Sequence, residues 1–442
     1  MIRVRFAAPV TGHLFASGAR VALANYLFAR RTNGQMLLRI DDMDKDRSRA
    51  GQADQIIQDL HWFGIDWNDV AYQSERADLY SSTIERLKRD NFLYPCFESK
   101  EELKAKQDFR RKRNQPVIYD RAMLSLTPKQ RQDAEAGGKR PHWRFKLSGR
   151  TLEWKDLVSG PKRATLSTVS DPILVHADGS PTSLLASVVD DVDFGTTHII
   201  RAEDSAENTA VQVEIFDVLA GSRTPVRFAH LPALNDAGRA PSGERGVGNL
   251  ALRALRADGV EPSAIAACMT GTDIDKHGPV SLESMSRRFE LTGAIASGFD
   301  VKRMLTLNRQ ILGGLDFASV VDRLPGGATE AFWLSVRESL DLLKEARGWW
   351  DVVAGTIVPP VMDGARDLLL TAGALLPADP WDESVWSTWS TALERATGLS
   401  GEDLLGPLRL ALTGEDSGPA LSSLLPLIGR PRAASRLAIA AA

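Results

Sequence analysis

The stretch RVRFAAPVTGHLFASGARVALANYLFAR, residues 3–30, decides the fold class. Residues 4–7 are typical of a strand, the Thr-Gly pair at 11–12 predicts a turn, and apolar residues between 19 and 27 recur at helical spacing. In α/β proteins, a parallel strand that leads through glycines into a helix presents backbone N–H groups to phosphate. The turn FASG, residues 15–18, offers a phosphate little besides its backbone. The stretch therefore predicts an α/β domain, but it is a weak signal for a nucleotide site.

The alternation of strand and helix continues along the first half of the chain. Met36–Ile40 is typical of a buried strand that ends in Asp41, and carboxylates at such strand ends lie where α/β proteins bind ligands. HIIRAED, residues 198–204, predicts a second buried strand that ends in charge, and a helix over 208–219 follows. From about residue 300 onward the pattern is almost entirely helical. The sequence thus predicts an α/β nucleotide-type domain with an insertion, followed by an all-helical half.

Composition narrows the class of protein. The chain has 442 residues, of which 43% are hydrophobic and 25% charged, so it is long enough for several domains. Its net charge of −3 means that a polyanion partner would need a local basic patch. Two cysteines, Cys96 and Cys268, give no disulfide framework, which fits a reducing compartment. No apolar run approaches the roughly 20 residues that span a bilayer, so we expect a cytoplasmic protein without a membrane partner.

Four longer stretches, in order along the chain, carry a more specific pattern. They are LLRIDDMDKDRS (37–48), GKRPHWRFKL (138–147), SVVDDVDFGTTHIIRAEDSAENTAVQ (187–212) and GPLRLALTGEDSGPALSSLLPLIG (406–429). The first is similar to LRIEDTDxxRS and the third to VVDDxxxxxTHVIRGEDHxxNTxxQ. Both are motifs of the bacterial glutamyl-tRNA synthetases, and the chain resembles this family of class I aminoacyl-tRNA synthetases along nearly its whole length.

The resemblance implies a domain organisation. We expect a Rossmann-type catalytic domain over 1–74 and 186–230, interrupted by an acceptor-stem-binding domain over 75–185. A stem-contact region with a signature loop would follow over 231–300, and an all-helical anticodon-binding domain over 301–442. We also expect a monomer.

The resemblance implies a reaction as well. Glutamate attacks the α-phosphate of ATP, which is bound with Mg²⁺, and the glutamyl group of the resulting adenylate passes to a tRNA of the glutamate type. A basic helix end over 110–113 is a candidate tRNA contact, although a charge run of this kind is also typical of a solvated helix surface. Its residues are Arg110, Arg111, Lys112 and Arg113.

Both ATP signature loops of the family are altered in this chain. The first usually reads His-Ile-Gly-Gly or a close variant, and its positions here hold Phe15, Ala16, Ser17 and Gly18. Phenylalanine cannot donate the hydrogen bond of a histidine, and His13 lies two residues earlier. The second loop usually reads Lys-Leu-Ser-Lys-Arg. Two registers stay open for it, with the core at 241–244 or at 243–246, and its candidate residues are Ser242, Gly243, Glu244 and Arg245.

The pocket for substrate glutamate keeps part of the family's pattern. Arg5 and Arg201 fall on the two arginines that bind substrate carboxylate, and Asp41 replaces the glutamate that holds the amino group, one methylene shorter. Ser183 replaces a tyrosine, which enlarges the pocket, and Pro9 replaces a serine. The predicted pocket residues are Arg5, Ala7, Asp41, Ser183, Ser187, Arg201 and Ser205.

A zinc site is not expected. Some relatives hold zinc with Cys-x-Cys and a later Cys-x-His, and the corresponding residues here are Cys96, Glu98, Met123 and Ser125. One thiolate does not make a structural zinc site, so we expect a buried free thiol at Cys96.

Three functions remain open from the residues. The first is a glutamate–tRNA ligase with unusual ATP loops. The second is a paralogue that binds tRNA without charging it, and the third is an adenylating enzyme for another amino acid or acceptor. The altered loops predict weak or absent adenylation, and ATP–pyrophosphate exchange separates the three.

Overall fold

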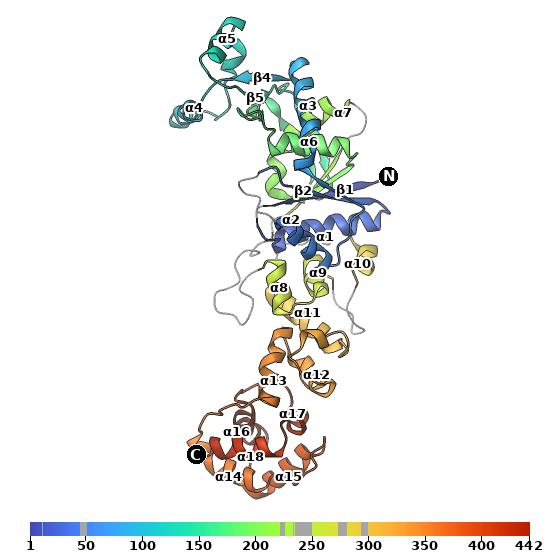
Figure 1. Ribbon diagram of the computed structural model, residues 1–442, viewed down its shortest axis with the longest axis vertical. Helices are drawn as coiled ribbons and strands as arrows, with labels where there is room; N and C mark the ends of the chain where they lie inside the picture. Colours follow the sequence, from blue (N-terminus) through green and yellow to red (C-terminus); the bar gives the residue numbers. More distant parts are fainter. Residues whose placement is uncertain are drawn as a thin grey trace.

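The computed structural model of the chain describes residues 1–10, 12–44, 51–221, 226–232, 234, 250–272, 281–292 and 299–442. The molecule is elongated (Figure 1), with part of the predicted insertion at one end, the N-terminal sheet near the middle and the helical C-terminal part at the other end. The N-terminus lies at the side of the middle part, whereas the C-terminus lies at the helical end.

Two mainly parallel sheets form the centre of the molecule. The first has the order β1-β2-β3, with Arg3 opposite Gln35 and Pro9 opposite Asp41. The second has the order β7-β6-β10-β9, in which only β6 and β7 are antiparallel. The backbone N–H of Thr197 donates to the carbonyl of Arg3 at 2.9 Å, so β9 begins beside β1. The strands are β1 (Arg3–Pro9), β2 (Gln35–Asp41), β3 (Asp69–Tyr72), β6 (Thr151–Asp156), β7 (Gly160–Thr165), β9 (His198–Ala202) and β10 (Arg227–Leu231).

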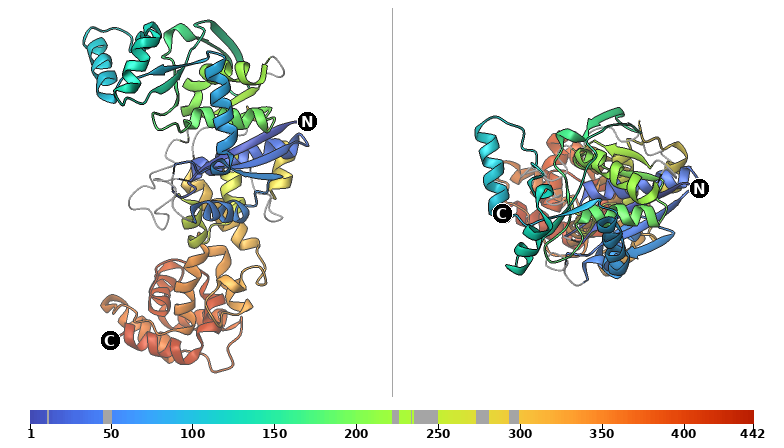
Figure 2. Two further views of the ribbon diagram at one scale, coloured as in Figure 1. Left: turned by 45° about the horizontal axis from the view of Figure 1, so that its top comes forward. Right: turned by 90° about the horizontal axis from the view of Figure 1, so that it is seen from above.

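A third sheet lies further out, with the order β4-β5-β8. Its strands are β4 (Leu93–Cys96), β5 (His142–Phe145) and β8 (Ile173–Val175). Helices α4 (Lys100–Lys112) and α5 (Pro128–Ala136) project from it and bury none of their residues. Both views of Figure 2 show these two helices at the outside of the molecule. Each begins with a capping box, on Ser99 and on Thr127, which stabilises a helix that lacks a packed face.

The remaining helices cover the sheets or form the C-terminal part. Helix α1 is rich in alanine on its buried face, which lets it pack closely on the sheet. From residue 300 onward the described chain contains helices and no strand, as the sequence predicts. The helices are α1 (Ala16–Arg31), α2 (Gln52–Trp62), α3 (Ala77–Arg89), α6 (Ser183–Asp193), α7 (Thr209–Ala220), α8 (Leu252–Asp258), α9 (Pro262–Thr270), α10 (Leu282–Arg288), α11 (Val301–Gly314), α12 (Glu330–Val336), α13 (Ala346–Ala354), α14 (Arg366–Ala374), α15 (Val385–Thr397), α16 (Glu402–Thr413), α17 (Leu421–Ile428) and α18 (Arg430–Ala440).

Three hydrophobic cores hold these elements together. One joins β1, β2 and α1 to helices α8–α11, and one fills the C-terminal helices around Trp333 and Trp389. The third joins residues of the predicted insertion, such as Tyr80 and Phe145, to Phe228 of β10. The predicted boundary at 75–185 therefore runs through one continuous core, and strand β6 from that segment pairs with β10 of the central sheet.

Candidate functional site

A cavity of about 650 Å³ opens at the carboxyl ends of β1, β2 and β9 and at the N-terminus of α1. This is where parallel α/β sheets place their ligands. All seven predicted pocket residues line it, together with three of the four residues of the first signature loop. The predicted residues that it brings together are Arg5, Ala7, Asp41, Ser183, Ser187, Arg201, Ser205, Phe15, Ser17 and Gly18.

The start of helix α1 forms one wall of this cavity. Phe15 is the N-cap residue with 43% of its surface exposed, and its side chain gives the helix no cap hydrogen bond. Its ring lies edge-on to His13, with the ring centroids 6.5 Å apart. Ala16 is fully buried and does not line the cavity, and its N–H donates to the carbonyl of Leu250 at 2.9 Å. Of the first signature loop, Phe15, Ser17 and Gly18 line the cavity.

The second signature loop cannot be placed in this site. Its candidate residues Ser242, Gly243, Glu244 and Arg245 lie outside the described residues.

Arg5 is buried beneath the cavity as half of an ion pair. Its Nε donates to Oδ1 of Asp191 at 2.8 Å, and both side chains are at most 5% exposed. Asp191 comes from α6, so the pair ties the first strand to a helix far along the sequence. The charge of Arg5 is therefore neutralised inside the protein.

Arg39 holds the carboxylate of Asp41 in a bidentate clamp. Its Nε and Nη2 donate to the two carboxylate oxygens at 2.7 and 3.1 Å, and it also donates to the Ser187 carbonyl and Oγ at 3.3 and 3.2 Å. Asp190 and Asp191 lie within 4 Å of the same guanidinium. Burial lowers the pKa of Arg39, but the three carboxylates outweigh it and raise the pKa above its usual value. Arg39 is thus a permanent positive charge that fixes Asp41 at the cavity wall.

Among the described residues of the cavity wall, Arg201 is the arginine without a carboxylate partner. Its Nε donates to Nε2 of His230 at 3.1 Å, and its Nη2 donates to the carbonyl of Ser205 at 3.0 Å and to Oγ1 of Thr209 at 2.9 Å. Burial, followed by repulsion from Arg5, lowers the pKa of Arg201 to about 10. A half-buried cation of this kind, open to a cavity, is a binding group for an anion.

The other arginines around the cavity are neutralised by carboxylates, in contrast to Arg201. At the cavity wall and behind it, Arg5, Arg39 and Arg76 form ion pairs with the four carboxylates of Asp41, Asp190, Asp191 and Asp193. Three cations thus face four anions, so the cluster is more than neutralised within itself. Arg201 is the cation of the described cavity wall that remains for a ligand.

The three predicted serines have different environments. Ser183 is the first residue of α6 and lines the cavity. Ser187 accepts from Arg39, as described above, and Oγ of Ser205 donates to Asp204 at 3.1 Å. The space left by these small side chains is part of the cavity.

Four residues of the site were not among the predicted ones. Arg39 could have been found, because a charged residue inside a buried strand is itself a signal of a buried partner. Asp191 lies in a stretch quoted for its resemblance, but its pairing with Arg5 depends on the fold. His230 and Asp156 meet through the pairing of β10 with β6, which no local pattern indicates.

Cys96 is a buried thiol without a disulfide partner, as predicted, and burial raises its pKa to about 11. Its Sγ lies 3.5 Å from Oη of Tyr119. Glu98 accepts from Tyr119 and from Lys106, both at 2.6 Å, so its carboxylate is occupied. Met123 and Ser125 lie in a short 3₁₀ turn, Ala122–Ser125. Among the described residues, no cluster of three or more His, Cys, Asp or Glu side chains suits a metal ion.

At the predicted basic end of α4, Arg111, Lys112 and Arg113 are exposed, whereas Arg110 is half-buried. Arg111 pairs with Asp108 at 3.0 Å, Arg110 donates weakly to the carbonyl of Pro116, and the guanidinium of Arg113 stacks on Phe109 at 4.0 Å. Helix α4 ends at Lys112. The structure leaves this charge at the surface of an outlying helix, which suits either a phosphate backbone or solvent.

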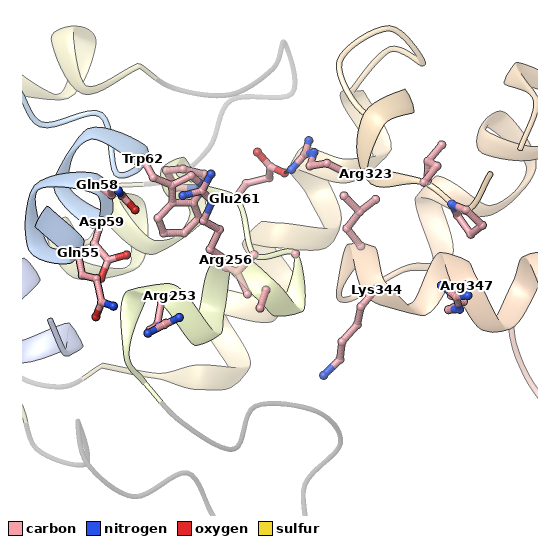
Figure 3. A pocket seen from close by; sticks show the side chains of 17 residues that line it. Gln55, Gln58, Asp59, Trp62, Arg253, Arg256, Glu261, Arg323, Lys344 and Arg347 are labelled. Atoms are coloured by element: carbon pink, nitrogen blue, oxygen red, sulfur yellow. Dashed lines mark hydrogen bonds and ion pairs between the residues drawn. The ribbon is translucent and has the colours of Figure 1, made fainter. Parts of the chain in front are cut away.

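A second cavity, of about 960 Å³, lies where α2 and α8 meet the helical part. Figure 3 shows Arg253 and Arg256 on one side of it and Lys344 and Arg347 on the other. Arg323 pairs with Glu261 at 2.6 Å, whereas no ion pair to a described residue holds Arg253 or Arg347. We call this basic surface the junction cavity.

Comparisons with known proteins agree with this architecture. The profile described as "tRNA synthetases class I (E and Q), catalytic domain" matches residues 1–294, and that of the "Anticodon binding domain" matches residues 362–441. A protein of Acidiphilium cryptum named glutamate–tRNA ligase 2 is 49% identical, with 100% of both chains covered. One of the same name from Granulibacter bethesdensis is 48% identical over 99% of this chain and 98% of its own length.

A solved structure shows the same fold. It is a glutamate-tRNA synthetase from Elizabethkingia anophelis, with a TM-score of 0.81, 24% sequence identity, and coverage of 100% of this chain and 99% of its own. Within the described residues, no helix is both long and apolar enough to cross a membrane. The match over residues 1–294 and the full-length relatives establish that this chain belongs to the class I glutamyl- and glutaminyl-tRNA synthetase family.

Proposed function

We propose that this chain is a glutamate–tRNA ligase, which activates glutamate with ATP and transfers it to tRNA. The observation that carries the proposal is Arg201, a cation at the cavity wall that has no carboxylate among its described hydrogen-bond partners. A substrate carboxylate would supply the negative charge that the protein itself does not place there. The full-length relatives named glutamate–tRNA ligase support the choice of substrate.

Asp41 would receive the ammonium group of the substrate. Arg39 occupies one lone pair on each oxygen of its carboxylate, and a carboxylate has about four acceptor sites, so one can still accept from an ammonium group. Its side chain is 27% exposed and lies at the cavity wall. Because Arg39 fixes it, the shorter side chain of aspartate is already oriented before the substrate arrives.

The phosphates of ATP would lie at the start of α1. The first N–H groups of a helix lack intrahelical partners, and Ser17 and Gly18, the second and third residues of α1, line the cavity. ATP supplies an electrophilic α-phosphorus for the carboxylate oxygen and pyrophosphate as the leaving group. The carboxylates among the described lining residues are Asp41 and Asp204, which do not form a cage for Mg²⁺. This fits a Mg²⁺ ion that is held mainly by the ATP phosphates.

The tRNA would meet at least two basic surfaces, the end of α4 and the junction cavity. At both surfaces, some guanidinium groups form no ion pair with a described carboxylate. Such groups can bind the phosphates of a polyanion.

The test of the proposal is ATP–pyrophosphate exchange with purified protein, with glutamate, glutamine and aspartate compared. We expect exchange with glutamate that Arg201→Met abolishes, whereas Arg110→Gln leaves it unchanged. Exchange with another amino acid alone, or exchange that survives Arg201→Met, would refute the proposal.

Phe15 favours a second candidate, a protein that binds tRNA without charging it. Its exposed ring stands where the family has a hydrogen-bond donor, and the loss of one donor to a developing charge costs about 10²–10³ in rate. Phe15→His separates the two candidates, because Phe15 is exposed and the change should not disturb folding. A ligase gains exchange rate from this repair, whereas a protein that only binds shows no exchange with or without it.

A further inference from the structure

Arg201 is held from behind by a chain of buried side chains. Nε of Arg201 contacts Nε2 of His230 at 3.1 Å, and Nδ1 of His230 contacts Oδ2 of Asp156 at 2.6 Å. His230 is 3% exposed and Asp156 1%. The chain runs from the cavity wall into the sheet, from β9 through β10 to β6.

The partners of His230 fix its tautomer. The Nε–H of an arginine can only donate, so Nε2 of His230 must accept and carry no proton. The proton of the neutral ring therefore lies on Nδ1, which donates to Asp156. If the proton lay on Nε2 instead, two N–H groups would face each other and Arg201 would lose this bond.

Asp156 is suited to accept the hydrogen bond from that N–H group. Its carboxylate accepts from the backbone N–H groups of Val158 and Ser159, both at 2.9 Å, and from the N–H of His230 at 3.4 Å, in addition to the imidazole. Burial raises the pKa of the Asp156 carboxyl, but these hydrogen bonds outweigh it and hold the pKa well below its usual value. Asp156 therefore stays an acceptor and does not compete for the proton on Nδ1.

The same chain also fixes the direction of the guanidinium. Thr209 accepts from Nη2 of Arg201 at 2.9 Å and contacts Nε2 of His230 at 3.1 Å. The imidazole stacks on Phe228, with the ring planes 2° apart, so it is fixed in the sheet. The guanidinium is thus bound along its inner edge.

We propose that Asp156 and His230 are positioning residues for substrate binding, which hold Arg201 in one orientation toward the substrate carboxylate by keeping His230 in its Nδ1-protonated tautomer. The inference rests on the proposed function for the identity of the substrate, glutamate. The tautomer of His230 and its hydrogen bond with Arg201 follow from the geometry alone.

The activity test compares two buried histidines on neighbouring strands. His230→Leu removes the acceptor for Arg201. His198→Leu is the matched control, because His198 on β9 is also buried but contacts Thr197 and Phe28 rather than Arg201. We expect His230→Leu to raise the KM for glutamate about 10- to 100-fold, the effect of removing a hydrogen bond to a charged group, with the KM for ATP unchanged. His198→Leu should change neither KM.

Asp156→Asn is the second variant, because it keeps the size of the side chain. The amide can donate to Nδ1 and so favours the opposite tautomer, in which Nε2–H opposes Arg201. We expect a rise in the KM for glutamate close to that of His230→Leu. In His230→Gln the side-chain oxygen can accept a hydrogen bond from Arg201, so the KM for glutamate should rise less than in His230→Leu.

A spectroscopic measurement tests the tautomer of His230 without any measurement of activity. In full-length protein with ¹⁵N-labelled histidine and arginine, we expect His230 to show a proton on Nδ1 and none on Nε2, and the Arg201 Nε–H signal to exchange slowly with water. Both signatures should disappear in Asp156→Asn, while the spectrum of His198 is unchanged.

The outcomes separate the two proposals. If the wild-type protein shows the tautomer but no exchange with glutamate, the proposed function fails and the positioning role stands. If it exchanges glutamate but His230 is protonated on Nε2, or if His230→Leu raises the KM for glutamate no more than His198→Leu does, the positioning role is wrong.

Discussion

Removal of Asp191 should destabilise the protein more than any exposed ion pair can account for. Its carboxylate lies 2.8 Å from Nε of Arg5 and 3.9 Å from Nη1 of Arg39, and all three side chains are at most 5% exposed. Asp191→Leu would leave Arg5 as a buried cation without a partner, and breaking a buried pair in this way costs about 3–5 kcal/mol. Arg39 would still pair with Asp41 and Asp190, so the loss in free energy of unfolding would come mainly from the unpaired charge of Arg5.

Urea unfolding of four proteins measures this cost: the wild type, Arg5→Met, Asp191→Leu and the double variant. We expect the double variant to be more stable than the sum of the single effects predicts, because two apolar side chains of similar volume can replace a buried pair at little cost. Asp108→Leu is the control. It breaks the exposed pair with Arg111, which is 60% exposed, and should cost less than about 1 kcal/mol. A cost for Asp191→Leu no larger than that of the control would refute the view that Arg5 is neutralised inside the protein.

Two further predictions concern tRNA binding and pH. Changing Arg110, Arg111, Lys112 and Arg113 to glutamate should weaken binding of a glutamate-type tRNA. In filter binding across a salt series, the slope of log K against log salt concentration should flatten by ~0.9 for each phosphate that the protein no longer neutralises. An unchanged slope would mean that the helix end is a solvated surface. Burial, followed by the charge of Arg144, lowers the pKa of His142 from 6.5 to about 4, so the unfolded chain binds this proton more readily. The stability that a neutral His142 contributes is complete above pH 6.5 and declines as the pH falls toward 4, so His142→Gln should lose less stability than the wild type between pH 7.5 and pH 5; equal losses would show that other groups dominate.

The order of the elements could be predicted from the sequence because it depends on local patterns. The strand at 36–40, the helix at 208–219 and the all-helical half beyond 300 follow from hydrophobic spacing, and the structure confirms each of them within a residue or two at its ends. The resemblance implies one pocket for Arg5, Asp41 and Arg201, and the structure places all three at one cavity. For Asp41 the position at the carboxyl end of a parallel strand is a further reason to expect this.

The pairings within the site could not be predicted in the same way. The resemblance implies the same role for Arg5 and Arg201, and only the fold shows that Asp191 neutralises the first while the second has no carboxylate partner among the described residues. Such a difference depends on contacts between segments that are far apart in the chain, and the hydrophobic periodicity of the sequence does not predict these contacts. The roles of the pocket residues and of Phe15 therefore stay predictions that binding and exchange measurements must test.

The position of Asp156 links two parts of the molecule that the sequence separates. It ends strand β6, whose hairpin with β7 lies within the predicted insertion, yet its carboxylate is linked through His230 to Arg201 at the cavity wall. The hairpin reaches this place because β6 pairs with β10 at Asp156 and Phe228, close to His230. A change that shifts the hairpin by even part of an ångström would lengthen the 2.6 Å bond to His230 and loosen Arg201. Substitutions in the hairpin should therefore affect glutamate binding more than their distance along the sequence suggests.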